Sequence, residues 1–223
     1  MRTAKQKRVV AFRTYLRTLL HEVGHHVDYT GLRLPDSFHT EGFYKRESSL
    51  FAQLVPERRA TMPTMAEYAK QPVAARLARC EKSADELAAA LRGQGEAVLA
   101  RRPDGKNWAA KECVCHLRDA EQLFQAVLKT TPVQDKPAFP FPDADKLAAE
   151  GKYLEADAAQ AAADFRRRRD ETLRMLRTLT PEQWKRGFSI GDNAMTLDAL
   201  AALMAWHDDN HLDQLKRALE GKA

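Results

Sequence analysis

The sequence of 223 residues combines 36 Lys and Arg with 31 Asp and Glu, and 44% of its residues are hydrophobic. This length and composition fit one or two soluble globular domains and exclude a chain that is disordered throughout. Three Cys exclude a disulfide scaffold and favour a reducing compartment, which we expect to be the cytoplasm. No apolar run approaches the roughly 20 residues of a membrane span, and the apolar stretch behind the basic start is too short for a secretion signal.

The positive charge and the histidines are unevenly distributed along the chain. Residues 1–60 carry 11 Lys and Arg against 6 Asp and Glu, whereas residues 61–223 carry 25 of each kind. The net charge of +5 therefore belongs to the first 60 residues, which also hold four of the seven His. The difference predicts two units, residues 1–60 and 65–223, joined by a linker at Val55–Pro63.

Apolar residues at helical spacing predict mostly helices. In the first unit they predict a helix over residues 8–29 and a second, short helix over Phe43–Leu54. In the second unit they predict four long helices, over residues 65–100 with a break near Gly93–Gly95, and over residues 108–129, 154–179 and 197–220.

The connections between these helices look irregular. Residues 130–150 hold four of the ten Pro, and Thr180 caps a short helix that begins with Pro181. No segment shows the alternation of a convincing strand. The pattern predicts an all-α fold, a four-helix bundle with an extra N-terminal helical segment.

Two His lie one turn apart in the last predicted helix. His207 and His211 differ by only about 40° around the helix axis, so both imidazoles point the same way. Such a pair can bind a divalent transition metal. The third ligand would be His116, in the helix over residues 108–129, which is the other His after residue 60. Three protein ligands leave one coordination position open, as catalytic sites do.

Polar residues near these His could orient the ligands. Glu112 and Asp119 each lie one turn from His116, and Gln214 lies on the same helix face as His211. The alternative is that the three His satisfy hydrogen bonds within the core, and the spacing leaves both interpretations open.

The residues around the three His resemble the DinB-like domain family. The resemblance rests on Asn107–Glu112, His116–Glu121 and His207–Gln214, and it covers roughly Met65–Gly221. That family is a four-helix bundle whose metal is held by one His of the second helix and an HxxxH pair of the fourth. The resemblance thus implies the same three ligands here. Members include thiol-S-transferases that use low-molecular-weight thiols, and metal-dependent hydrolases.

We therefore expect a metal-dependent enzyme, either a hydrolase or a thiol-S-transferase, that acts on a small molecule. Zn²⁺ or Ni²⁺ would lower the pKa of a coordinated water to about 7, and would deprotonate a low-molecular-weight thiol cosubstrate in the same way. We expect neither a nucleic acid nor a membrane as a partner, and the sequence is compatible with a homodimer. A metal-binding or stress-related module without turnover is the non-enzyme alternative.

Four consecutive Arg, Arg166–Arg169, stand in the helix predicted over residues 154–179. On a helix they fan around the axis instead of forming one stripe. Acidic neighbours can pair with them locally, so we interpret the run as a solvated helix face and not as a nucleic-acid groove.

The first unit carries a second motif typical of metal sites. Residues His21–His25 form an HExxH string that resembles the active-site helix of zincin metalloproteases. There the two His bind zinc, and Glu22 would be the general base. The resemblance implies a third ligand downstream, for which Glu47 is the leading candidate and Glu41, Asp28 and His39 are the alternatives.

A zincin binds its peptide along a sheet that precedes the HExxH helix. Only 20 residues precede His21, and they are too few to build and bury such a sheet. We therefore interpret residues 1–60 as a truncated zincin fragment that could bind metal through His21, His25 and Glu47. A zincin-type metallopeptidase stays an alternative function. The simplest interpretation is an amphipathic helix whose His and Glu side chains are solvated and bind no metal.

Overall fold

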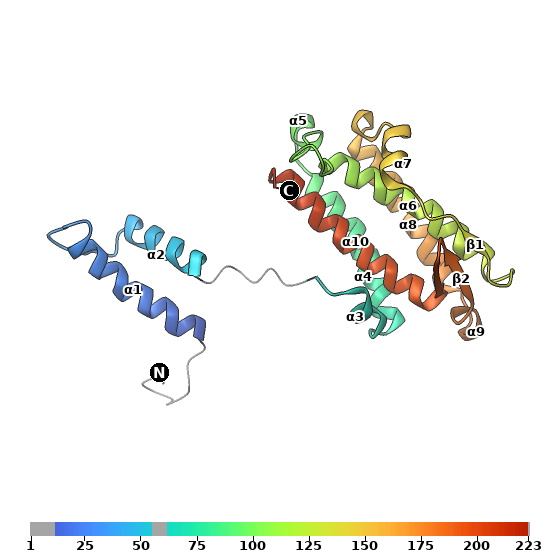
Figure 1. The fold of residues 1–223 in the computed structure, drawn as a ribbon, viewed down its shortest axis with the longest axis horizontal. Coiled ribbons are helices and arrows are strands. Elements are labelled where there is room, and N and C mark those ends of the chain that lie inside the picture. The colour runs from blue at the N-terminus through green and yellow to red at the C-terminus, as the bar shows by residue number, and fades with distance from the viewer. Residues whose placement is uncertain (1–11, 55–61, 223) are drawn as a thin grey trace. The chain divides into compact units, whose positions relative to one another are not determined.

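The computed structural model describes residues 12–54 and 62–222. The chain divides into two compact units, Met1–Thr61 and Met62–Ala223 (Figure 1). Helices dominate the described part of both units, and none of these helices combines the length and hydropathy that crossing a membrane requires. The linker predicted at Val55–Pro63 falls largely on residues 55–61, which lie outside the described residues.

The first unit consists of two helices, α1 (Phe12–Thr30) and α2 (Glu41–Leu54), which pack against each other. Phe43 of α2 is almost fully buried against α1. Gly24 of α1 makes room for this ring, because a Cβ at that position would lie 3.1 Å from it. Both helices predicted from the sequence are present, within the described residues.

The second unit is built on four long helices, α4 (Val73–Leu91), α6 (Ala110–Thr130), α8 (Ala158–Arg177) and α10 (Leu197–Leu219). They form a ring in which α4 packs against α8 and α10, and α6 packs against the same two helices (Figure 1). The all-α four-helix bundle predicted from the sequence is confirmed. Because α6 and α10 are neighbours, side chains from both can meet between them.

The first predicted helix of the bundle is broken twice. Residues 65–100 form α3 (Met65–Ala69), α4 and α5 (Glu96–Leu99). The first break falls at Pro72, directly before α4. A proline lacks the N–H that would continue the helix from α3. The second break falls where the sequence predicts it, at Gly93, which adopts a φ of 76°. Periodicity missed the first break because α3 and α4 bury side chains in the same apolar cluster.

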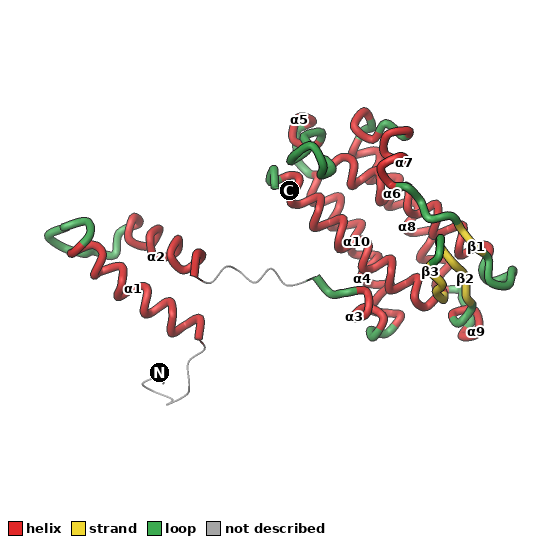
Figure 2. The backbone as a smooth tube through the Cα atoms, in the orientation of Figure 1, coloured by secondary structure: helices red, strands yellow, loops and turns green. Residues whose placement is uncertain are grey.

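A small sheet lies beside the bundle (Figure 2). The hairpin of β2 (Gly187–Ile190) and β3 (Asn193–Thr196) turns at Gly191, whose φ is 56°, and β1 (Ala138–Phe139) pairs with β2 in parallel. No strand is predicted here from the sequence, and that expectation was wrong. Strands of two to four residues are too short to show alternation, and the Gly-Asp turn was the one available signal.

Short helices complete the second unit. They are α7 (Ala144–Glu150), the 3₁₀ turn η1 (Tyr153–Glu155) and α9 (Pro181–Trp184). The side chains of Asp143 and Thr180 cap α7 and α9, and Thr180 forms the capping box that the sequence predicts. The stretch over residues 130–150 thus contains β1 and α7 and is not irregular throughout.

Arg169 corrects the expectation that Arg166–Arg169 is a solvated face. Its side chain is fully buried in the bundle. It donates to Glu121 of α6, with Nη2 2.6 Å from Oε1, and to Asp208 of α10, with Nη2 2.9 Å from Oδ1. Four successive residues fan around a helix, so at least one of them faces the bundle axis, and that one needs buried carboxylates.

Candidate metal centre

Three imidazoles meet between α6 and α10. His116 of α6 approaches His207 of α10, with 3.0 Å between their Nε2 atoms. One ring nitrogen from each of His116, His207 and His211 lies within 4.8 Å of the other two. Two nitrogens that each bind a metal at about 2.0–2.1 Å lie roughly 3–3.5 Å apart, so the separation of His116 and His207 is that of two ligands of one metal.

All three imidazoles are held in the neutral state. Burial, together with the nearby His211, lowers the pKa of His116 to about 3. Burial and the two neighbouring imidazoles place the pKa of His207 well below its usual value, and burial also lowers the pKa of His211. Neutral imidazoles carry the free lone pair that metal ligation requires.

Gln214 fixes the tautomer of one candidate ligand. Its Oε1 lies 2.9 Å from Nδ1 of His211. A carbonyl oxygen only accepts, so His211 donates from Nδ1 and keeps the lone pair of Nε2 for a metal. Nδ1 of His207 is buried and lacks a hydrogen-bond partner among the described residues. Three neutral imidazoles from two rigid helices fit a divalent transition metal.

The two acids between His207 and His211 anchor α10 in the bundle. Asp208 accepts hydrogen bonds from Arg169 of α8 and from Oγ of Ser83 on α4, the latter at 2.5 Å. Asp209 accepts from Nε of Arg79 on α4 at 2.7 Å. These contacts fix the position of α10 against α4 and α8, and with it the position of both imidazoles.

The anchoring role of Asp208 was not predicted from the sequence. Its signal was present, because Asp208 lies four residues from both Met204 and Leu212 and therefore on the apolar face of the helix. A charge on that face needs a buried partner of opposite charge. The fully buried Arg169 is that partner.

The two acids proposed to orient His116 have other partners. Glu112 caps α6 by accepting from the backbone N–H of Ala109 at 2.9 Å, and it pairs with Arg102. Asp119 accepts from Arg118 at 2.8 Å and from the hydroxyl of Tyr153 at 2.8 Å. The structure therefore places Gln214, but neither of these acids, in hydrogen-bond contact with one of the three imidazoles.

Asp119 is nevertheless held as a carboxylate at the edge of the site. Burial alone would favour its neutral form, but hydrogen bonds from Arg118 and Tyr153 keep the pKa of Asp119 below its usual value. It lines the same cavity as His116. A fixed negative charge at this wall would favour a bound cation.

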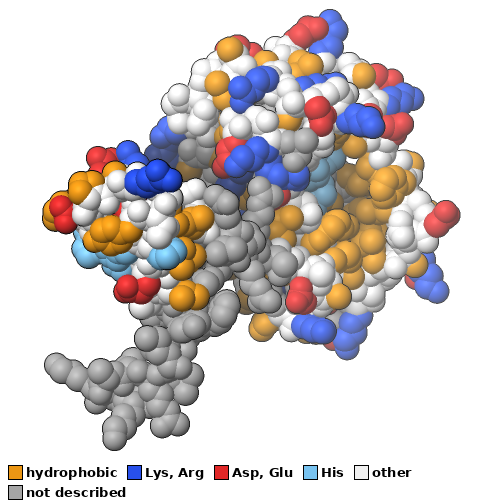
Figure 3. Space-filling model, turned by 60° about the vertical axis from the view of Figure 1, so that its left-hand side comes forward, with side chains coloured by type: hydrophobic (Ala, Val, Ile, Leu, Met, Phe, Trp, Pro, Cys, Tyr) orange, Lys and Arg blue, Asp and Glu red, His pale blue; other side chains and the backbone are white. Residues whose placement is uncertain are grey.

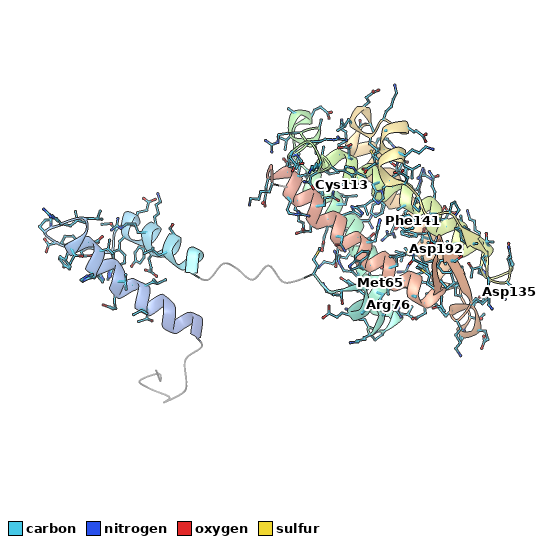
Figure 4. The ribbon with its side chains drawn as sticks, in the orientation of Figure 1. Met65, Arg76, Cys113, Asp135, Phe141 and Asp192 are labelled. Carbon is cyan, nitrogen blue, oxygen red and sulfur yellow. The ribbon has the colours of Figure 1, made fainter. Side chains whose placement is uncertain are left out.

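A cavity of about 370 Å³ opens onto the three imidazoles. Its wall is mostly apolar and includes Leu123, Phe124, Phe141, Pro142, Leu203 and Trp206. Phe141, labelled in Figure 4, and Pro142 come from the stretch over residues 130–150, so this connection lines the site. The space-filling view of the second unit likewise shows histidine beside a broad group of hydrophobic side chains (Figure 3).

Trp108 also lines the cavity. Its ring stacks on His211, with ring centroids 6.2 Å apart, and meets His116 edge-on at 5.1 Å. Its Nε1–H donates to Asp145 of α7 at 2.9 Å. The indole therefore links the imidazoles to α7, within residues 130–150.

The HExxH helix of the first unit gathers a second set of imidazoles. His21 and His25 of α1 meet His39, one of the alternatives considered for the third ligand. The leading candidate, Glu47, contacts His21 at its other nitrogen, with Oε2 3.1 Å from Nδ1. Glu22 is exposed, and no described contact joins it to the three imidazoles. Residues 12–54 contain no strand.

The other two alternatives for the third ligand form ion pairs with basic residues of α2. Asp28 is buried and pairs with Arg46 of α2 at 2.5 Å. Glu41 is exposed and pairs with Lys45 one turn later, at 2.7 Å.

The second unit is thus a candidate metal-binding helical bundle, with one His on its second long helix and an HxxxH pair on its fourth. The family model of the DinB superfamily matches residues 79–215, which is more than half of the chain, so the chain belongs to the DinB superfamily. The match does not include the first unit.

Among solved structures, the chain is similar to YfiT from Bacillus subtilis, which is described as a probable metal-dependent hydrolase with an unusual four-helix bundle topology. The alignment covers 69% of this chain and 90% of that chain, with a TM-score of 0.64 and 22% sequence identity. This likeness shows a shared fold. A search of curated proteins gave no match.

Proposed function

We propose that this chain is a metal-dependent hydrolase that acts on a small, largely apolar molecule. The observation that carries the proposal is the convergence of three neutral imidazoles, from His116, His207 and His211, on a mostly apolar cavity. Catalytic metal sites combine such an incomplete set of protein ligands with room for a substrate. The description of YfiT as a probable metal-dependent hydrolase supports the same assignment.

The surrounding residues prepare the site for this chemistry. A divalent metal with an open coordination position lowers the pKa of a water or thiol that occupies it. Gln214 orients His211, and the apolar side chains Phe124 and Leu203 exclude water and receive the apolar part of a substrate. The oxygens of Asp119 already accept hydrogen bonds, so this residue contributes negative charge and does not serve as a free base.

Thiol-S-transfer is the second candidate, and one observation favours it. A second cavity of about 610 Å³ shares Trp108 and Tyr153 with the first. Its lining carries three basic side chains and three acidic ones, namely Arg102, Lys106, Lys152, Glu112, Asp145 and Glu155. Two adjoining cavities offer room for two reactants. The thiol would come from solution, because all three Cys are buried and burial raises the pKa of Cys113 to about 12.

Metal content and turnover, measured together, test both candidates. The wild-type protein is compared with His211→Ala, and with His39→Ala as a matched control in the first unit. The substrates are small apolar esters and amides, and separately a thiol with monobromobimane. We expect chelation and His211→Ala to reduce turnover by at least about 100-fold, and His39→Ala to leave it unchanged.

The dependence on thiol decides between the two reactions. Turnover of esters or amides without thiol supports the hydrolase, and turnover only with thiol supports the transferase. Unchanged turnover in His211→Ala would overturn both. A metal-loaded protein that turns over neither kind of substrate would favour the non-catalytic metal-binding module.

A further inference from the structure

The imidazoles of the first unit converge through the same kind of atom. His39, in the loop between α1 and α2, places its Nε2 3.0 Å from Nε2 of His21 and 3.1 Å from Nε2 of His25. Three imidazole nitrogens thus lie within 4.8 Å of one another, and the two distances to His39 are those of nitrogens that share a metal.

Hydrogen bonds at the far nitrogens leave two of these Nε2 atoms with a free lone pair. Glu47 accepts from Nδ1–H of His21. Ser37 uses its hydroxyl proton to donate to Asp28, with 2.7 Å between Oγ and Oδ2. Its Oγ, 2.7 Å from Nδ1 of His25, can therefore only accept there. His21 and His25 therefore both carry their proton on Nδ1, and the lone pair of each Nε2 points toward His39.

We propose that His21, His25 and His39 form a second transition-metal site, in which Glu47 and Ser37 position two ligands without binding the metal. A carboxylate or another acceptor on the far nitrogen of a ligand imidazole is the usual second layer of a metal site. Without a cation, the lone pairs of His21 and His25 have only the single Nε2–H of His39 to share. Three imidazole nitrogens favour zinc, cobalt, nickel or copper over magnesium or calcium.

The small core of the first unit gives this site a structural role. Among its described side chains, Leu20, Phe43 and Asp28 are the buried ones, while Val23 and Val27 of α1 remain 38% and 36% exposed. The ring of Phe43 packs against all three imidazoles, at centroid distances of 4.6 to 5.3 Å. A metal would tie α1 to the loop, and through Glu47 to α2. Small units with little core commonly depend on such a link.

The metal stoichiometry of the full chain tests this proposal. The protein is freed of metal, titrated with Zn²⁺ or Co²⁺ and analysed for bound metal, and circular dichroism verifies that each variant is helical. We expect two ions per wild-type chain, one in His39→Ala, one in His116→Ala and none in the double variant. Two substitutions in the first unit serve as controls, His26→Ala and Glu22→Gln, since both residues are exposed and outside the cluster. Both controls should bind two ions.

The positioning role of Glu47 has its own readout. Glu47→Gln keeps an acceptor for Nδ1–H of His21, so it should keep two ions and the Co²⁺ absorption spectrum of the wild type. A changed Co²⁺ spectrum in Glu47→Gln would make Glu47 a ligand and overturn its assigned role.

Two further results would overturn the site itself. These are two ions in His39→Ala, or a single wild-type ion that disappears in His116→Ala. Failure of the bundle site would instead appear as a single ion that His39→Ala removes, so the two proposals fail in distinguishable ways.

Discussion

The two groups of three His differ in what holds them. In the bundle, His116, His207 and His211 all project from long helices, and ion pairs between distant helices fix those helices. In the first unit, His39 projects from a loop, and the other two rings are held by hydrogen bonds that they donate to Glu47 and Ser37. The packing of the bundle helices therefore positions the three His without a metal. We expect the first unit, in contrast, to need a bound metal in order to fold.

Chelation should produce the largest difference between the two units. We expect residues 18–50 to lose their amide protection in hydrogen exchange when metal is removed, because metal binding and folding are one process in a unit with so little core. The helices α6 and α10 should keep their protection, since buried apolar clusters hold them without metal. Equal responses of the two units to chelation would contradict the comparison.

Loss of a partner of Arg169 should be the next largest effect. Glu121→Ala leaves a buried guanidinium with one of its two carboxylates, which should lower the free energy of unfolding by roughly 3–5 kcal/mol. Denaturation followed by tryptophan fluorescence measures this for the second unit alone, because Trp108, Trp184 and Trp206 all lie in it. Metal binding by the first unit should be unchanged.

An exposed ion pair provides the control for Glu121→Ala. Arg177 pairs with Glu81 at 2.9 Å, and both side chains are about half exposed. Arg177→Ala should therefore change the free energy of unfolding by less than about 1 kcal/mol. A similar loss in both variants would show that the buried network has no special role in the bundle.

The smallest expected effect concerns Gln214 and Glu47, which each orient one imidazole, in the bundle and in the first unit respectively. Gln214→Ala and Glu47→Ala should each weaken metal affinity about 10- to 100-fold, at the site of the substituted residue only. Competition with a metal indicator, in chains that carry His39→Ala or His116→Ala to remove the other site, measures each affinity separately. If either substitution weakens the site of the other unit, the two sites are not independent.

Much of the fold was predictable because the helical spacing of apolar residues is visible in a single sequence. The four long helices follow from apolar spacing, and the capping box at Thr180 follows from local hydrogen bonding. The break at Pro72 and the hairpin at Gly191 were missed. The first leaves the apolar pattern unchanged, and the second involves strands too short to have a pattern.

The candidate ligands followed from sequence to different degrees. His207 and His211 share a helix face, so their proximity is a local property. His116 was assigned to them because few His were available and because of the family resemblance. In the first unit, four residues were candidates for the third ligand, and His39 is the one whose Nε2 lies near those of His21 and His25. A loop residue has no periodicity from which its direction could be inferred.

The sequence alone determined the helical class, the division of charge between two units and the pair of His on α10. Only the tertiary structure decided which distant side chains those helices bring together. In the tertiary structure Arg169 is buried between two carboxylates, and Phe141 lines the cavity. Glu47 contacts Nδ1 of His21, the nitrogen that faces away from the other two imidazoles. The physical reason is that helix spacing is a local property of the chain, whereas burial and coordination depend on the packing of distant elements.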